Sequence, residues 1–535
     1  MFIGDLSGRS GPDACPGALQ IHAAADGGLA RIRVPGGAVT AHQLRVVAAA
    51  ARELGSGVIE LTSRANLQVR GLPLPPEATP GPGGAACEGA GPGDGGLGGR
   101  ASSRDAAGSG DAAGRGGAQD FAARLAAAGL LPSATHERAR NIVASALAGR
   151  SPDSVLDVRP LAAELDRALC ARPGLAALPG RFLFALDDGS GDVAGLGADV
   201  TLLPSPPESD AAPGHAGSED AGPGFVGPGD AGPGAGPGLA GSDGVRPGAA
   251  EPGAAEPGDA EEVALLLAGV DHGLRVPAGA ATEGMLAVAE AFLAERAEQG
   301  SQAWRLSELV DGPGRVAARA ARSEPRLRLA AARPSEPSRP CDDAAGGSAV
   351  GVRGQRDGRA ALTVLAPLGR LTAAQVEALA EAADDGAGEV RLTPWRAVVV
   401  PDLPPGAADA WRAGLAEKGL VTDPASPWLG VTACAGRPGC AKSLADVHAD
   451  IRAALPAPRA DADVPGDAVR SPSVGGGPLP VHWAGCERRC GRPRGRVVDV
   501  IATVHGYRVE ADGVSRTFAD AEQTSAAVAA TREGQ

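Results

Sequence analysis

The pattern of hydrophobic and polar positions predicts two similar β–α–β units far apart in the chain. The first unit has an apolar run over 29–34, an Ala/Leu/Val-rich helix over 44–54 and strand residues between 58 and 72. The second has a strand over 362–365, a helix over 376–383 and a strand that starts at 390. An internal repeat of this kind implies a molecule with a pseudo-two-fold axis.

Both predicted helices are preceded by the same start signal. Thr40 is followed three residues later by Gln43, and Thr372 is followed in the same way by Gln375. A threonine with glutamine at this spacing is typical of a capping box, in which each side chain bonds the other residue's backbone amide. The alternative is chance similarity between two common patterns.

The two copies differ in the polarity of their last strand. In the first copy Arg64, Asn66, Gln68 and Arg70 alternate with other residues, so a continuous strand would place them on one face. The matching segment 392–403 lacks this alternation. Burying such a face without a partner is costly, and we therefore predict that it faces a polyanion. The alternative is a solvent-exposed face, where arginine and glutamine are usually found.

Three segments have compositions that predict disordered linkers. Residues 73–119 are Gly-rich with almost no large apolar side chains, residues 206–262 repeat Ala-Gly-Pro-Gly, and residues 334–358 are a weaker case. Segments of this kind bury too little apolar surface to offset the entropy of ordering them.

Composition and charge exclude several classes of protein. Glycine (80) and proline (46) fill nearly a quarter of the 535 residues, yet 43% of the chain is hydrophobic, which is enough for several cores. No run of about 18 apolar residues predicts a transmembrane helix, and no secretory signal is recognisable, so we expect a cytoplasmic protein. The net charge of −14 argues against a nucleic-acid binder. Eleven acids and one base in 206–262 carry most of it, so the rest of the chain is close to neutral.

Four of the eight cysteines form two close pairs. Cys434 and Cys440 are separated by five residues, and Cys486 and Cys490 by three. Disulfides are disfavoured in a reducing cytoplasm, and zinc prefers cysteines two to four residues apart. An iron–sulfur cluster tolerates wider spacing, so we favour a cluster and keep zinc or free cysteines as alternatives. Neighbouring cations would offset the charge of such a cluster: Arg437, Lys442, Arg488, Arg489 and Arg492.

The cysteine pairs, together with the motif Leu-Thr-x-Arg-x-Asn-x-Gln-x-Arg-Gly at 61–71, resemble the sulfite/nitrite reductase superfamily. Longer strings at 181–192, 428–434 and 485–490 resemble its precorrin-3B synthase branch. The resemblance implies an α+β fold of two ferredoxin-like half-domains and two larger α+β domains, with disordered Gly/Pro-rich insertions. We expect the two half-domains at 15–72 and 359–421. The larger domains are expected at 120–333 and, carrying the cluster, at 422–535.

The resemblance also implies roles for individual residues. Cys434, Cys440, Cys486 and Cys490 would hold a [4Fe-4S] cluster, and Cys490 would also bridge to the iron of a siroheme where one is bound. The catalytic arginines would be Arg64, Arg140 and Arg181. The substrate-binding residues would be Asn66, Gln68, Arg70 and Asn141.

One departure from the family pattern concerns the substrate. Sulfite reductases carry two lysines in a Pro-Arg-Lys-Phe-Lys stretch, whereas this chain has Arg181 and, at the second lysine position, Leu183. Because a small oxyanion would lose a charged partner there, the departure disfavours sulfite or nitrite. We therefore expect a precorrin-3B synthase-like monooxygenase of cobalamin biosynthesis, which converts precorrin-3A to precorrin-3B by O2-dependent C20 hydroxylation and lactone formation. A siroheme-dependent sulfite or nitrite reductase is the alternative.

The expected reaction requires further groups. The resemblance implies a mononuclear non-haem iron to activate O2, and an electron donor such as NADH with a reductase, or a ferredoxin. His482 is a candidate metal ligand, although a lone histidine is more often structural. Asp187, Asp188 and Asp192 are candidates for a cation or substrate site, although Asp-Asp-Gly-Ser-Gly is more simply a turn. We expect neither nucleic acid nor a membrane as a partner.

Overall fold

The computed structural model describes residues 15–74, 111–204, 262–332, 350–457, 479–493 and 495–532. Most of the predicted linkers 73–119, 206–262 and 334–358 lies outside these ranges. Two of their ends are ordered, against our prediction: α2 (Asp111–Ala127) and β12 (Gly351–Gly354) both begin inside a predicted linker. Their order comes from tertiary partners that composition does not reveal, since Phe121 and Leu125 of α2 are fully buried and β12 pairs with the next strand.

The predicted repeat is confirmed as two half-domains with the same order of elements. Each is an antiparallel sheet with a helix between its second and third main strands. The first contains β1 (His22–Ala24), β2 (Gly27–Ile32), α1 (Ala41–Leu54), β4 (Val58–Leu61) and β5 (Leu67–Leu72). The second contains β12, β13 (Ala360–Leu365), α6 (Ala373–Asp385), β15 (Glu389–Leu392) and β16 (Ala397–Leu403).

The half-domains exchange one short strand each. β3 (Ala38–Thr40) leaves the first half-domain and pairs with β15 of the second, in the order β12-β13-β16-β15-β3. β14 (Arg370–Thr372) does the reverse and pairs with β4, in the order β1-β2-β5-β4-β14. Each five-stranded sheet is therefore completed by the other half of the chain.

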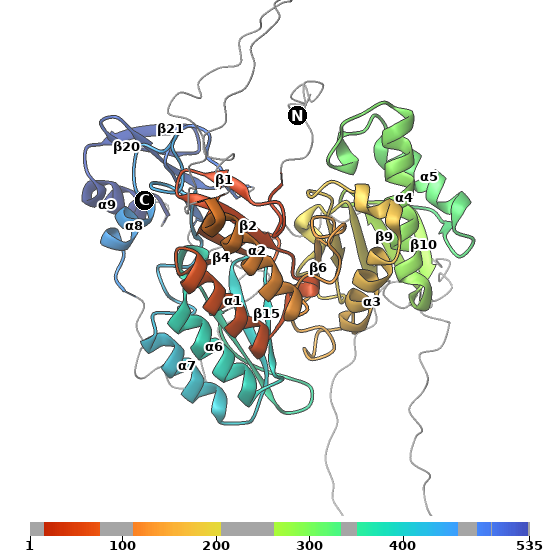
Figure 1. Cartoon of the computed structure of the whole chain (residues 1–535), viewed down its shortest axis with the longest axis horizontal. Coiled ribbons are helices and arrows are strands. Elements are labelled where there is room, and N and C mark those ends of the chain that lie inside the picture. The colour runs from red at the N-terminus through yellow and green to blue at the C-terminus, as the bar shows by residue number, and fades with distance from the viewer. Residues whose placement is uncertain are drawn as a thin grey trace, which may run out of the picture.

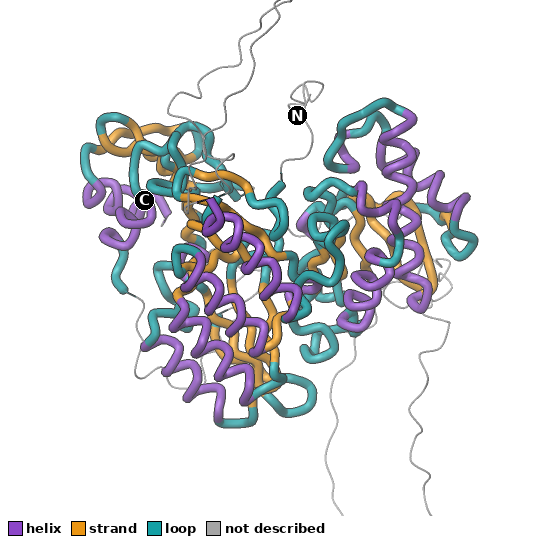
Figure 2. The backbone as a smooth tube through the Cα atoms, viewed as in Figure 1, coloured by secondary structure: helices purple, strands orange, loops and turns teal. Residues whose placement is uncertain are grey.

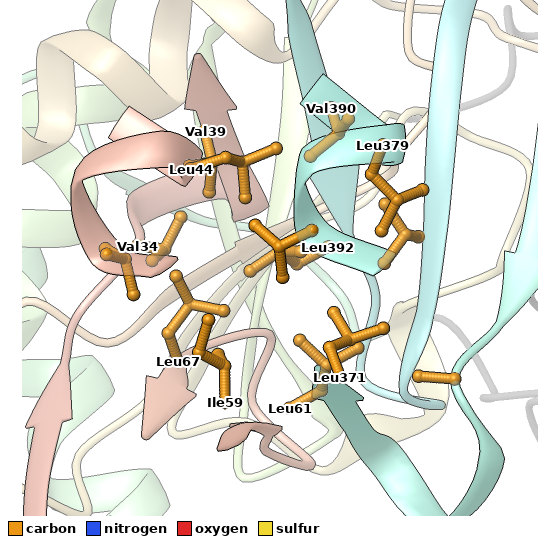
Figure 3. Close-up of a cluster of buried hydrophobic side chains, with 14 of the residues drawn as sticks. Val34, Val39, Leu44, Ile59, Leu61, Leu67, Leu371, Leu379, Val390 and Leu392 are labelled. Atoms are coloured by element: carbon orange, nitrogen blue, oxygen red, sulfur yellow. The ribbon is translucent and has the colours of Figure 1, made fainter. Parts of the chain in front are cut away.

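A layer of helices covers this pair of sheets. Helices α2, α1, α6 and α7 (Ala407–Glu417) lie side by side, with α1 and α6 in the middle (Figures 1 and 2). Both predicted capping boxes are present, on Thr40 and Thr372. The apolar faces of α1 and α6 meet side chains from both sheets in one shared core, part of which Figure 3 shows around Leu44, Ile59, Leu371 and Leu392.

The repeat extends to unusual backbone conformations. Ala65 (φ 53°) and Arg396 (φ 63°) occupy the same turn in the two copies, and both have the positive φ that non-glycine residues rarely adopt. Gly71 (φ 74°) and Asp402 (φ 62°) form a second such pair. The two copies therefore share backbone geometry even where their side chains differ completely.

The two larger domains also share a topology. In each, three parallel strands are followed by antiparallel strands. The first, which Figure 1 shows as a lobe beside the half-domains, contains β6 (Ile142–Ala144), α3 (Arg159–Cys170), β7 (Phe184–Leu186), β8 (Val200–Pro204), β9 (Glu262–Leu267), β10 (Val270–Pro277), α4 (Ala281–Glu298), α5 (Gly312–Ser323) and β11 (Arg328–Leu329). The second contains β17 (Val431–Ala433), α8 (Val447–Ala454), β18 (Val481–Ala484), β19 (Val498–Thr503), β20 (Gly506–Ala511), β21 (Val514–Phe518) and α9 (Ala521–Arg532).

Short 3-10 helices connect some of these elements: η1 (Pro35–Gly37), η3 (Pro173–Ala177), η4 (Ala194–Leu196), η5 (Ala278–Ala280), η6 (Leu306–Glu308) and η7 (Pro367–Gly369). The observed architecture confirms the predicted α+β class. Within the described ranges, no helix combines the length and the apolar character that a bilayer span requires.

Candidate iron–sulfur and anion site

The four predicted cluster cysteines lie on two loops that follow neighbouring parallel strands. Cys434 and Cys440 follow β17, and Cys486 and Cys490 follow β18. Because β17 and β18 run in parallel, their carboxyl ends and the loops beyond them lie at the same edge of the sheet. All four cysteines are free thiols, with Cys490 the most exposed.

Backbone contacts hold the two loops against each other. The amide of Gly485 donates a hydrogen bond of 3.1 Å to Sγ of Cys434, and the amide of Leu444 donates one of 2.8 Å to the carbonyl of Gly485. A Cβ atom at Gly485 would lie 1.8 Å from Oγ of Ser443, so only glycine fits between the loops. An amide directed at a cysteine sulfur is the kind of contact that tunes a thiolate-bound cluster.

The four thiols are not arranged as a preformed zinc site. Four sulfurs bound to one zinc at 2.3 Å would lie about 3.8 Å apart. Among the described residues, only Asp187, Asp188 and Asp192 form a group of three possible ligands within 4.8 Å of one another. The four cysteines are therefore more widely spaced than a zinc site requires. Burial, opposed by amides such as that of Gly485, raises the pKa of Cys434, and the neighbouring Cys486 and Cys490 raise it further.

The cations beside the cysteines are less available than we predicted. Arg489 forms ion pairs with Asp499 and Glu510, at 3.2 and 2.6 Å, and Arg492 pairs with Asp499 at 2.9 Å. Lys442 and Arg488 are exposed and form no ion pair with any described residue. Arg437 is likewise exposed, and its Nε donates to the carbonyl of Ser443 at 2.8 Å. These three side chains are positive charges that this edge of the domain presents to solvent.

The predicted polar strand is interrupted, so its residues do not all lie on one strand face. Thr62 to Asn66 form a tight turn, closed by a hydrogen bond of 2.9 Å from the amide of Thr62 to the carbonyl of Asn66. Arg64 lies in this turn, and only Gln68 and Arg70 belong to β5. The prediction was wrong here because a regular alternation of side chains does not reveal a residue such as Ala65, whose positive φ ends the strand.

Gln68 and Arg70 form hydrogen bonds and ion pairs with acidic residues of the first half-domain. Gln68 donates to Glu60 at 2.6 Å, and Arg70 forms ion pairs with Asp26 at 3.0 Å and Glu60 at 3.2 Å. These acids balance the charge of Arg70, which was not foreseen from the strand alone. Arg70 also donates to the carbonyl of Gly439 at 3.4 Å, so this face of the first half-domain contacts the cysteine loop directly.

A second arginine on the same face as Arg70 has no acidic residue among those described to neutralise its charge. Arg31 of β2 donates to Oε1 of Gln68 at 2.8 Å and forms no ion pair with any described carboxylate. Burial lowers the pKa of Arg31, and Arg181 and Arg70 contribute to the lowering. Sequence reasoning missed Arg31, although its alternation with the apolar Ala30 and Ile32 was a usable signal.

Arg64 and the predicted residue Asn141 donate to the same carbonyl. The carbonyl oxygen of Gly180 accepts hydrogen bonds from Asn141 at 2.7 Å, Arg64 at 3.2 Å and Arg33 at 3.4 Å. Asn66 joins this group by donating to Oδ1 of Asn141 at 3.2 Å. Burial and then the charge of Arg305 lower the pKa of Arg64 to about 10, which leaves it protonated at neutral pH.

Arg181 and Leu183 lie just after Gly180 in the chain, and their side chains have different environments. Arg181 is exposed, and its guanidinium lies 5.0 Å from the ring centre of Trp304. Leu183 is only 5% exposed and packs in the core shared with the half-domains. Leu183 therefore occupies a packing position, and its identity says little about the charge of an anion site.

Arg140 is engaged in a structural ion pair. Its guanidinium is 4% exposed and meets both carboxylate oxygens of Asp166 at 2.6 and 2.7 Å. It also donates to the carbonyl of Leu130 at 3.3 Å. The structure thus gives Arg140 a neutralising partner, while its predicted catalytic role stays a prediction.

Asp187 and His482 contact neighbouring residues, although Nε2 of His482 has no hydrogen-bond partner among the described residues. Asp187 accepts four backbone hydrogen bonds of 2.9 to 3.0 Å from Gly189, Gly191, Val193 and Ala194, which makes it the anchor of a turn. His482 is fully buried, with Nδ1 2.9 Å from Oγ1 of Thr432.

Two segments of the chain are similar to a known protein family. Residues 22–75 and 353–418 match the family model described as "Nitrite/Sulfite reductase ferredoxin-like half domain". These two matched segments coincide with the two half-domains of the fold.

Curated nitrite and sulfite reductases align with part of the chain. An assimilatory ferredoxin-dependent nitrite reductase of Haloferax mediterranei is 32% identical over 165 residues, which is 31% of this chain and 26% of the relative. A ferredoxin–nitrite reductase of Synechococcus elongatus is 32% identical over 152 residues, or 28% and 26% of the two chains. A ferredoxin sulfite reductase of Mycolicibacterium paratuberculosis is 29% identical over 147 residues. The matched regions thus span about a quarter of these relatives.

A solved structure extends the likeness to the whole fold. The NirA protein of Mycobacterium tuberculosis aligns over 93% of this chain and 79% of its own, with a TM-score of 0.59 and 19% identity. At this identity the match shows a common fold and no more.

These comparisons correct the expected function. The relatives are nitrite and sulfite reductases, which overturns the predicted precorrin-3B synthase-like monooxygenase. They give no support to precorrin-3A, O2 or NADH as reactants, and the non-haem iron is likewise without support. The error came from reading Leu183 as part of an anion site, whereas the structure buries it in a core.

Proposed function

We propose that this chain is a nitrite or sulfite reductase that uses a [4Fe-4S] cluster beside a siroheme. The observation that carries the proposal is the contact between the two candidate parts of the site. Arg70, on the arginine-bearing face of the first half-domain, reaches the carbonyl of Gly439 between two of the cluster cysteines. An electron-carrying group and an anion-binding face are thereby neighbours.

The residues present fit the two groups. Four free thiols on facing loops, with the Gly485 amide on one sulfur, suit a thiolate-bound cluster. A siroheme carries carboxylates, and arginine forks pair well with carboxylates. When bound, the two groups would supply electrons to the reduction of the small anion.

The arginines of the first half-domain would bind and orient the anion. Arg64 stays cationic because its pKa of about 10 is well above neutral pH. Arg31 has only the neutral amide of Gln68 as a close partner among the described residues, so its charge is available to a ligand. Charged donors held in a buried site bind an oxyanion far more strongly than they would in water.

A ferredoxin is the electron donor that this proposal favours. The nitrite reductase relatives are named for it, and a small acidic protein suits the exposed Lys442 and Arg488 beside the cysteines. The electrons would then enter at the edge of the domain where Cys490 is exposed.

Anaerobic purification followed by assays with each anion tests the proposal. We expect siroheme absorbance bands, stoichiometric iron and sulfide, and oxidation of reduced methyl viologen by nitrite or by sulfite. The preferred anion is the one with the higher kcat/KM. Arg64→Gln should lower that kcat/KM by about 10²-fold, while Arg52→Gln, an exposed arginine on α1, serves as the charge-matched control. Absence of siroheme, or no turnover of either anion, would refute the proposal.

A further inference from the structure

A second cavity rich in arginine lies far along the chain from the cysteines. It has a volume of about 290 Å³ and lies between the first larger domain and the second half-domain. Its lining includes Arg150 and Arg159 from the former, and Arg356 and Arg359 from the latter. Asp357 and Asp402 are the carboxylates among its lining residues. Asp157, outside the lining, pairs with Arg159 at 2.7 Å, which leaves Arg356 as the lining arginine without a carboxylate partner among the described residues.

The deepest arginine of this cavity is incompletely satisfied. Arg150 is 8% exposed and meets Asp402 through Nε and Nη2, at 2.8 and 2.7 Å. Its Nη1 has no hydrogen-bond partner among the described residues, although it is buried. A buried guanidinium donor without an acceptor is costly, and an acceptor in the cavity would offset that cost.

The acids of the cavity leave room for an anion at Arg356. Burial opposes ionisation of Asp402, yet hydrogen bonds from Arg150 and Gln355 hold its pKa below the ordinary value, so this acid is committed to those two partners. Asp357 is 55% exposed, and its nearest approach to Arg359 is 3.9 Å. The guanidinium of Arg356 bonds the carbonyls of Pro152 and Ser154 and pairs with no described carboxylate.

We propose that this cavity binds a small molecule that carries phosphate or carboxylate groups. Guanidinium groups from two domains surround a volume close to the lower limit for a ligand pocket, and their planar forks match both kinds of anion. The site is built from residues other than those of the reductase site, so its test is independent of the proposed function. Because both domains contribute, a bound anion would also stabilise their contact.

Isothermal titration of the purified protein with inorganic pyrophosphate and with citrate, at constant ionic strength, tests this site. We expect saturable binding of at least one probe, and the tighter one identifies a phosphate or a polycarboxylate ligand. The double variant Arg356→Gln/Arg359→Gln should weaken that binding by about tenfold or more. The control Arg52→Gln/Arg322→Gln removes the same charge from exposed positions outside the cavity and should leave binding unchanged.

Two outcomes would overturn the proposal. One is the absence of saturable binding of either probe to the wild-type protein. The other is equal weakening in the cavity variant and in the control, which would show a non-specific response to net charge. A thermal melt of each variant without ligand confirms that both are folded.

Discussion

Ser145 and Cys434 are structural counterparts in the two larger domains. Each directly follows the first parallel strand of its sheet, and each donates its amide to a carbonyl on the neighbouring strand, that of Leu186 or Trp483, at 3.0 Å. Each side chain then accepts an amide at 3.1 Å, from Asp188 in one domain and Gly485 in the other. A hydroxyl and a thiol thus make the same contact on the same backbone.

This correspondence separates the fold of the cysteine loop from its chemistry. Because serine supports the same hydrogen bond at position 145, Cys434→Ser should leave the fold intact and remove a cluster ligand. We expect a melting temperature of the metal-free protein close to that of wild type, with most of the iron and sulfide lost. Cys170→Ser, at a thiol far from these loops in the chain, is the matched control. Full iron content in Cys434→Ser would contradict the ligand assignment.

Gly485 is expected to be intolerant of any side chain. A Cβ atom there would lie 1.8 Å from Oγ and 2.8 Å from Cβ of Ser443. Gly485→Ala should therefore cost about 1–3 kcal/mol of unfolding free energy through overpacking, measured by urea denaturation.

Two further variants make this test specific. Gly485→Ala/Ser443→Gly removes the opposing side chain and should recover most of the loss. Gly174→Ala, where a Cβ would meet nothing within 4 Å, should change stability little. A Gly485→Ala protein as stable as wild type would show that the loops are not in contact as described.

The Arg140–Asp166 pair should be a structural requirement. Asp166→Asn would leave a guanidinium that is 4% exposed without its counter-charge. The expected cost is about 3 kcal/mol of unfolding free energy, because removing one partner of a buried ion pair leaves the other charge buried and unpaired. Replacing both residues, as Arg140→Met/Asp166→Leu, should cost less than the single change. A double-mutant cycle measures this difference, and additive losses would argue against a coupled pair.

The acidic turn predicts how stability depends on pH. Burial and then repulsion from Asp187 raise the pKa of Asp192 to about 7, from an ordinary value of 3.8. Between these values the folded protein holds a proton that the unfolded chain has released. The stabilising contribution of this group is therefore complete below pH 4 and is lost as the pH rises towards 7.

Asp192→Asn tests this contribution while keeping an acceptor for the Ser145 hydroxyl. The variant should lose the downward slope of stability between pH 4 and 7, which we expect to amount to roughly 3 kcal/mol in wild type. Urea unfolding at several pH values measures the slope. Asp409→Asn, at a side chain that is 77% exposed, should retain it. An identical slope in Asp192→Asn and wild type would mean that another group is responsible.

The parts of this structure that follow from local signals were predictable. The capping boxes at Thr40 and Thr372 depend on residues three apart, and both are present as expected. The cysteines stood out because their types and spacings are unusual. Contacts between distant residues were not predictable. Asp166 neutralises Arg140 across 26 positions. Arg70 is neutralised by Glu60 of β4 and by Asp26 in the turn between β1 and β2.

A pattern can also have two physical causes. Leu183 was interpreted as a lost cation, but in three dimensions it faces a core, where leucine is the expected residue. The correspondence of Ser145 with Cys434 could not be recognised in the sequence for a related reason. The strands that align them share a topology but little sequence, so only their hydrogen-bonded register brings the two residues into comparison.

The exchanged strands have a consequence for biosynthesis. The sheet of the first half-domain is completed by β14 (Arg370–Thr372), about three hundred residues after its own strand β4. A ribosome must therefore translate well past the middle of the chain before that sheet can close. Until the second copy has been synthesised, the edge of the sheet at β4 remains unpaired. The two copies therefore reach their native state together rather than one after the other.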